Sequence, residues 1–189
     1  MVAIPTNSSS ASERRFYFIF LIKVFLIYLT WRLFEFIIGI ESEPLENRMF
    51  PQLSYYWEWL NNQLRIGLIY VTRLILSVFG YESEITNNYV LTVTGYRGIA
   101  IGNYCLAFQF MFFYSSLVFI SPVPARVKLW SIPAGCLMIQ ALNVFRFVGL
   151  HLVIIHLSGW ENKMHDYFFN GAALILTLLM YMKLLSRYG

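Results

Sequence analysis

Three residues with reactive or charged side chains follow one another along the apolar second half of the chain: Cys105, Arg146 and His165. A cysteine attacks acyl groups as its thiolate, so it needs a base or a cation nearby, and a histidine can serve as either. Arginine stays protonated in proteins and supplies a fixed charge that stabilises an oxyanion or holds a carboxylate. Together these residue types predict nucleophilic acyl chemistry on a thiol.

Four further polar residues lie close in sequence to these three and are candidates for substrate binding or support: Asn103, Asn143, Asp166 and Arg97. Asn143 precedes Arg146 by one helical turn, which places both on one helix face. Asp166 is adjacent to His165 and is a candidate to orient its imidazole. For Arg97 two interpretations remain open, because it could guide a substrate carboxylate or simply end a strand.

No motif for other kinds of chemistry accompanies these residues. The sequence has no glycine-rich phosphate loop, no zinc-type spacing of Cys and His, and no GxSxG motif. His151 and His156 are five residues apart and do not share a helix face well enough for a haem or metal site. Cys136 gains no support from neighbouring motifs and is expected to be structural. We therefore predict no metal and no cofactor.

The composition excludes a water-soluble globular protein. Of 189 residues, 58% are hydrophobic, 19% are aromatic and only 13% are charged, whereas a soluble domain has about 25% charged residues. Two cysteines are too few for a disulfide scaffold. The net charge of +4 comes from basic residues at the ends of apolar runs, which predicts membrane topology and no nucleic-acid partner. The expected partner is the lipid bilayer.

Four apolar runs are long enough to cross a bilayer, and they cover residues 16–40, 104–125, 129–156 and 165–182. The run 57–79 contains Arg65 and Arg73, and is either a fifth span or an interfacial amphipathic helix. With four spans, the loop that carries Arg126 and Lys128 and the carboxyl end that carries Lys183 and Arg187 both lie on the cytoplasmic side, as basic residues prefer. A fifth span at 57–79 would place both outside, so we favour the interfacial interpretation. Residues 85–100 show the alternation and turn signals of short strands.

The predicted fold class is therefore an all-α integral membrane protein with four transmembrane helices, or five if 57–79 also crosses, and a short β segment. Residues 1–15 form a cytoplasmic tail and 16–40 the first span. Residues 41–103 form an outer-face segment, and 104–189 a three-helix catalytic core. This topology places the cysteine, arginine and histidine on the outer side of the membrane.

Three motifs in order give a resemblance to a known family. Gly102-Asn103-Tyr104-Cys105 opens one span, Asn143-Val144-Phe145-Arg146 lies late in the next, and His165-Asp166 begins the last. In type, order and spacing they resemble the exosortase/archaeosortase membrane transpeptidases, over about residues 85–187. The chain is short and resembles the compact members of that family.

The resemblance implies a membrane-embedded cysteine protease or transpeptidase that acts on secreted proteins with a carboxy-terminal sorting signal. Cys105 would cleave the signal through a thioester and pass the protein to an acceptor, with Arg146 stabilising the oxyanion and His165 carrying the proton. It also implies the cytoplasmic membrane of a prokaryote, with the active site on the outer face of the cell envelope.

A rival interpretation needs no chemistry. A non-catalytic membrane subunit or chaperone of an envelope export or polysaccharide system would use the same spans for helix packing and the segment 41–103 for docking. The two hypotheses differ in what they predict for Cys105→Ala, which abolishes function in the first and is harmless in the second.

Overall fold

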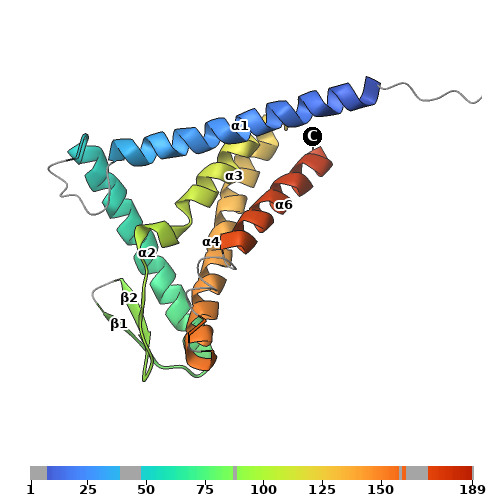
Figure 1. Cartoon of the computed structure of the whole chain (residues 1–189). Coiled ribbons are helices and arrows are strands. Elements are labelled where there is room, and N and C mark those ends of the chain that lie inside the picture. Colours follow the sequence, from blue (N-terminus) through green and yellow to red (C-terminus); the bar gives the residue numbers. More distant parts are fainter. Residues whose placement is uncertain (1–7, 39–47, 87–88, 158, 161–169, 189) are drawn as a thin grey trace, which may run out of the picture.

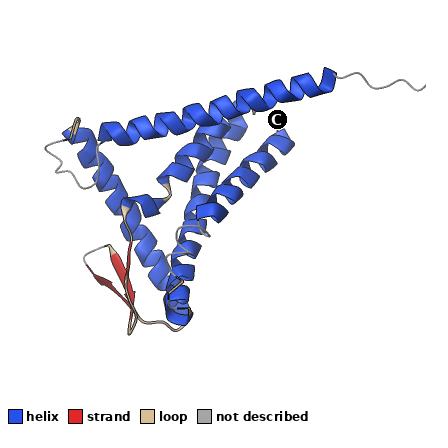
Figure 2. Cartoon of the chain, in the orientation of Figure 1, coloured by secondary structure: helices blue, strands red, loops and turns tan. Residues whose placement is uncertain are grey.

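The computed structural model describes residues 8–38, 48–86, 89–157, 159–160 and 170–188. This part of the chain is mostly helical, with five α-helices and one small three-stranded sheet (Figure 2). The α-helices are α1 (Ser8–Ile38), α2 (Pro51–Val78), α3 (Phe108–Ile120), α4 (Ala125–His156) and α6 (Asn170–Tyr188). The mostly helical class and the short β segment predicted from the sequence are both confirmed.

The helices form an open triangle rather than a bundle of parallel spans (Figure 1). Helix α1 runs across one end of the molecule, while α2 and α4 extend away from it and converge at the opposite end. Helices α3 and α6 occupy the space near α4 and end on the α1 side. The first helix therefore does not run alongside α4, as a first transmembrane span would be expected to do.

The sheet lies beside α2, at the end of the molecule that is remote from α1 (Figure 1). It comprises β1 (Ser83–Thr86), β2 (Val90–Val93) and β3 (Ile99–Ala100) in the order β1-β2-β3 with antiparallel pairing. Leu91 and Val93 alternate with half-buried residues along β2, as expected for a strand with one buried face. The strands match the alternation predicted for residues 85–100 and begin slightly earlier.

The predicted span 104–125 is interrupted. A 3₁₀ turn, η2 (Asn103–Leu106), is followed by Ala107 in the left-handed region, with φ of 59°. Only Phe108–Ile120 is then α-helical, and its 13 residues cover about 20 Å at 1.5 Å per residue. That length is well short of a hydrocarbon core of about 30 Å, so the predicted second span is wrong as a single continuous crossing.

Two helices, fewer than the four spans predicted, are long and apolar enough to cross a membrane among the described residues: α4, and Gly171–Tyr188 within α6. In α1 the charged residues Lys23, Arg32 and Glu35 interrupt the apolar pattern. Helix α2 is confirmed as a helix and begins at Pro51, earlier than the predicted 57. Two apolar helices of this length indicate association with a membrane.

Two apolar clusters hold the elements together. One joins α2, the sheet, η2 and α4 around the buried side chains of Leu76, Leu91 and Phe147. The other joins α1, α3, α4 and α6 around Leu117 and Ile139. Because η2 and α3 connect the two clusters, the turn that carries Cys105 is fixed from both sides.

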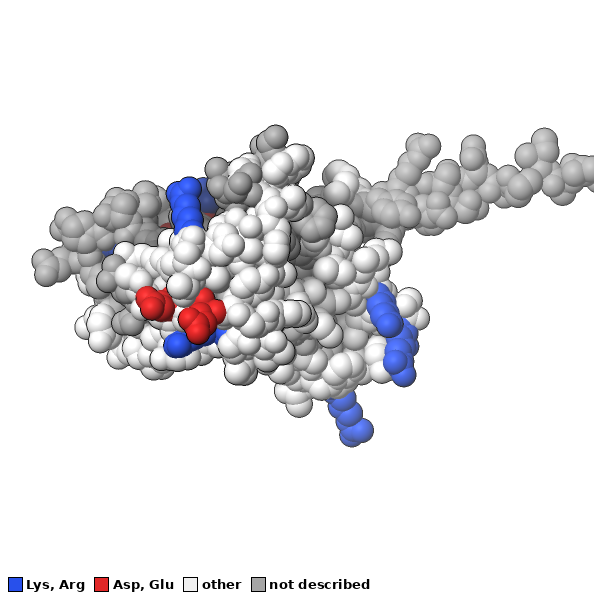
Figure 3. Space-filling model, turned by 90° about the horizontal axis from the view of Figure 1, so that it is seen from below, with Lys and Arg blue, Asp and Glu red and all other residues white. Residues whose placement is uncertain are grey.

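Large apolar side chains remain exposed along α1, α3, α4 and α6, among them Phe18, Phe25, Phe119, Leu137 and Leu179. Seen from the end that carries the sheet, the surface is mainly uncharged, with a few acidic and basic side chains (Figure 3). Exposed apolar area on this scale marks a surface that contacts lipid or protein rather than water.

Candidate functional site

Cys105 lies in the 3₁₀ turn that precedes α3. Its backbone N–H donates a hydrogen bond to the carbonyl of Gly102, with an N···O distance of 3.0 Å. The turn cannot continue directly into α3 because Ala107 adopts a positive φ. Carbonyls at such a helix end lack partners within the helix, so side chains from elsewhere must satisfy them. The Cys105 side chain is half-buried against the cluster around Leu91 and Phe147.

Two side chains of α4 supply these partners. Asn143 Nδ2 donates a hydrogen bond to the Cys105 carbonyl at 2.8 Å. Gln140 Nε2 donates one to the Leu106 carbonyl, also at 2.8 Å. Because Asn143 and Gln140 are three residues apart, they occupy one face of α4. The structure therefore brings both Asn143 and Gln140 to the turn that carries Cys105.

Arg146 lies one turn beyond Asn143 on α4 and is only 6% exposed. Both line a cavity of about 190 Å³ between α3, α4 and α6. Its other lining residues are largely apolar, and include Ala107, Ala172, Ala173 and Thr177. A guanidinium in such surroundings acts as a strong fixed charge on whatever enters, because little water screens it.

His165 and Asp166 lie outside the described residues. Helix α6 begins at Asn170, five residues after His165, and its first two turns carry the alanines that line the Arg146 cavity. Arg97 is exposed between β2 and β3. The structure thus places Cys105, Asn143 and Arg146 in one region, and leaves Arg97 at the surface.

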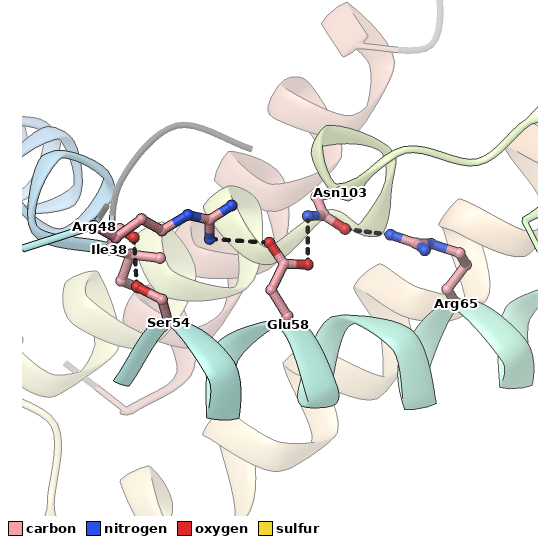
Figure 4. Close-up of polar contacts among 6 residues, drawn as sticks. All are labelled: Ile38, Arg48, Ser54, Glu58, Arg65 and Asn103. Carbon is pink, nitrogen blue, oxygen red and sulfur yellow. Dashed lines mark hydrogen bonds and ion pairs between the residues drawn. The ribbon is translucent and has the colours of Figure 1, made fainter. Parts of the chain in front are cut away.

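Asn103, a candidate for substrate binding or support, faces α2 (Figure 4). Its Oδ1 accepts a hydrogen bond from Arg65 Nη2. Its Nδ2 donates one to Glu58 Oε2 at 3.4 Å, and Glu58 Oε1 in turn forms an ion pair with Arg48 at 3.2 Å. None of the sequence motifs predicted this network. Glu58 and Arg65 are seven residues apart, which places both on one face of a helix. That spacing was the signal in the sequence that could have pointed to the network.

A second cavity, of about 400 Å³, lies beside this network, between α1, α2 and the start of α3. Glu58, Asn61, Asn103 and Tyr104 all contribute to its lining. Because Asn103 and Tyr104 immediately precede Cys105, the cysteine turn lies between the two cavities.

The other residues considered from the sequence have structural contacts. The ring nitrogens of His151 lie 2.8 Å from the Phe147 carbonyl and 3.2 Å from the Leu91 carbonyl, which ties α4 to β2. Cys136 Sγ lies 3.5 Å from Ser115 Oγ, between α4 and α3. Both contacts fit the packing roles expected for these residues.

Comparisons of this chain with family models, curated proteins and solved structures found no match.

Proposed function

We propose that this chain is a membrane-embedded cysteine transpeptidase or protease with Cys105 as its nucleophile. The observation that carries the proposal is the hydrogen bond from Asn143 to the Cys105 carbonyl, because Asn143 lies one helical turn from the buried Arg146 and lines the same cavity. A thiol and a permanent cation held by one pair of elements are the components that thiol acyl transfer needs.

The cavity around Arg146 supports the proposal. Ala107 and Asn143 connect it to the cysteine turn, and Ala172 and Ala173 connect it to α6. Its lining is mostly apolar, which suits an extended peptide segment or the end of an apolar helix. In such surroundings a guanidinium stabilises a developing oxyanion more strongly than it would in water.

The proposed reaction has two acyl-transfer steps. His165 takes the thiol proton, and the Cys105 thiolate attacks the scissile carbonyl to form a tetrahedral oxyanion that Arg146 stabilises. The C–N bond then breaks, the amine leaves with the proton from His165, and a thioester remains. An acceptor amine attacks the thioester, the C–S bond breaks as a new amide forms, and the acceptor's proton returns through His165 to the thiolate.

The resemblance to exosortases and archaeosortases supplies the proposed substrate and location. The substrate is a secreted protein with a carboxy-terminal sorting signal that contains a short motif, a hydrophobic helix and a basic tail. The site acts on the outer face of a prokaryotic cytoplasmic membrane. Both α4 and α6, which line the Arg146 cavity, are apolar enough to lie in that membrane.

The test is processing of a co-produced substrate of this kind, followed as a mass shift on a gel. Wild type is expected to process it, and Cys105→Ala is expected to abolish processing because no thioester can form. Cys136→Ala is the matched control. Cys136 is also half-buried, and among the described residues its hydrogen-bonding contact is with Ser115, a packing neighbour. It should process normally.

Persistent processing by Cys105→Ala, at wild-type protein levels, would contradict the proposal. That result would favour the rival, a non-catalytic membrane subunit or chaperone of an export or polysaccharide system.

A further inference from the structure

The cavity beside Glu58 and Asn103 lies on the opposite side of the cysteine turn from Arg146 and has no role in the proposed transfer reaction. Its volume is about 400 Å³, and it is bounded by α1, α2 and the η2–α3 junction. That volume falls within the range of small-molecule sites. What it would accept follows from the chemistry of its lining.

One part of the lining is aromatic. Trp31, Phe34, Trp57 and Phe108 all contribute to it. Their rings contact one another, with centroid distances of 5.1 Å between Phe34 and Trp57 and 4.7 Å between Trp57 and Phe108. Rings packed in this way have little rotational freedom, so they present a fixed apolar surface suited to an apolar side chain.

The charged groups of the lining are paired with one another. Arg48 pairs with Glu58, and Arg32 pairs with Glu35 at 2.6 Å. The second oxygen of each carboxylate also accepts a hydrogen bond. Glu58 accepts one from Asn103 Nδ2, and Glu35 accepts one from Trp31 Nε1. Among the described residues of the lining, two cations and two anions therefore balance, which favours a neutral ligand over an ion.

Asn61 is the exception in this lining. It is fully buried at 0% exposure, and within the described part of the chain neither its Oδ1 nor its Nδ2 has a hydrogen-bond partner. A buried amide without partners costs stability, because it has lost its water without replacement. The side chain offers one acceptor and two donors on adjacent atoms, which matches a ligand that has an N–H beside a C=O.

We propose that this cavity binds a neutral peptide segment, in which the N–H and the C=O of one residue in extended conformation form paired hydrogen bonds with Asn61 and an apolar side chain packs on the aromatic rings. The peptide C=O would accept from Nδ2 and the peptide N–H would donate to Oδ1. The proposal goes beyond acyl transfer, because binding here requires neither Cys105 nor Arg146.

The test uses N-acetyl-leucine N-methylamide, a neutral probe with two peptide groups and one apolar side chain. It is titrated into the purified full-length protein in detergent micelles, and binding is followed by the fluorescence of the tryptophans, two of which line the cavity. Wild type is expected to bind saturably, and Asn61→Leu, of similar shape, to bind at least tenfold more weakly. Asn61→Leu should also raise the thermal unfolding midpoint, which separates loss of binding from loss of folding.

Thr72→Val is the matched control. Thr72 is also fully buried in α2, its hydroxyl also lacks a partner among the residues that the structure describes, and it does not line the cavity. Thr72→Val should keep wild-type binding. Cys105→Ala should also keep it, so that failure of the transfer reaction and failure of this binding site can be distinguished.

Absence of saturable binding in wild type, or unchanged binding in Asn61→Leu, would overturn the proposal. Equal or tighter binding of N-acetylglucosamine, an amide on a polar sugar, would overturn the peptide assignment.

Discussion

At the scale of single residues, the cysteine turn depends on two amide side chains that reach backbone carbonyls. Asn143 was a candidate from the sequence, because its spacing from Arg146 places both on one helix face, but its bond to the Cys105 carbonyl was not predicted. Gln140 was not a candidate. Its partner is the Leu106 backbone carbonyl, which becomes available to a side chain only because the 3₁₀ turn ends there. The contact between Asn103 and Arg65 joins residues 38 apart in sequence, and no local pattern reports such a pairing.

Asn143→Val should impair catalysis without unfolding the protein. One hydrogen bond to a backbone carbonyl contributes about 1 kcal/mol to stability, whereas a nucleophile displaced by about 1 Å can lose on the order of 100-fold in rate. We expect at least tenfold slower processing and a changed rate of Cys105 alkylation, measured in a Cys136→Ser background so that only one thiol reacts. The change in alkylation rate would report the position of the thiol itself.

Thr177→Val is the control for that experiment. Thr177 lines the same cavity, but its hydroxyl donates to the Ala173 carbonyl of its own helix at 2.7 Å. It should leave both rates unchanged. Wild-type processing and alkylation in Asn143→Val would show that Asn143 does not position the cysteine.

At the scale of elements, α3 and α4 are in close contact. Tyr114 of α3 packs directly on Gly135 of α4, where an added Cβ would lie 1.9 Å from the tyrosine Cε1. The sequence predicted the helices near 129–156 and 165–182 and the strands, because apolar period and turn signals are local. It did not predict the break at Ala107, because hydropathy counts apolar residues and does not report a left-handed residue.

Gly135→Ala should destabilise the protein. Overpacking of a close helix contact costs about 1–3 kcal/mol, and here the obstacle is a buried ring that also hydrogen-bonds to the Ser131 carbonyl. We expect a lower thermal unfolding midpoint in detergent micelles.

Gly67→Ala serves as the matched substitution in α2, where nothing lies within 4 Å of an added Cβ. It should be neutral or stabilise by up to about 1 kcal/mol through helix propensity. A Gly135→Ala variant as stable as Gly67→Ala would contradict the packing described for α3 and α4.

At the scale of the whole molecule, the direction of α1 changes the expected topology. Helix α1 crosses the end of the triangle at which α4 begins and α6 ends (Figure 1). Arg126 and Lys128 lie in the first turn of α4, and Lys183 and Arg187 lie in the last turns of α6. The sequence could place these basic residues on one side from charge bias, but not the direction of α1, which depends on contacts with distant helices.

The basic end of the triangle should therefore face the cytoplasm, because positively charged flanks are retained inside. The check uses single cysteines in the Cys105→Ala, Cys136→Ala background. Thr94→Cys, exposed beside the sheet, should react with a membrane-impermeant maleimide on intact cells. Ser186→Cys, exposed near the end of α6, should react only after permeabilisation. The reverse pattern would contradict this orientation, and with it the outer-face site.

The most direct test of thiol acyl transfer is to look for the thioester itself. The full-length protein is incubated with substrate, quenched in acid and digested, and the peptide that contains Cys105 is examined by mass spectrometry with and without hydroxylamine. We predict a mass increase equal to the acyl part of the substrate, confined to Cys105 and removed by hydroxylamine. An unmodified Cys105 peptide during active processing, or an adduct that persists in Cys105→Ala, would contradict the account.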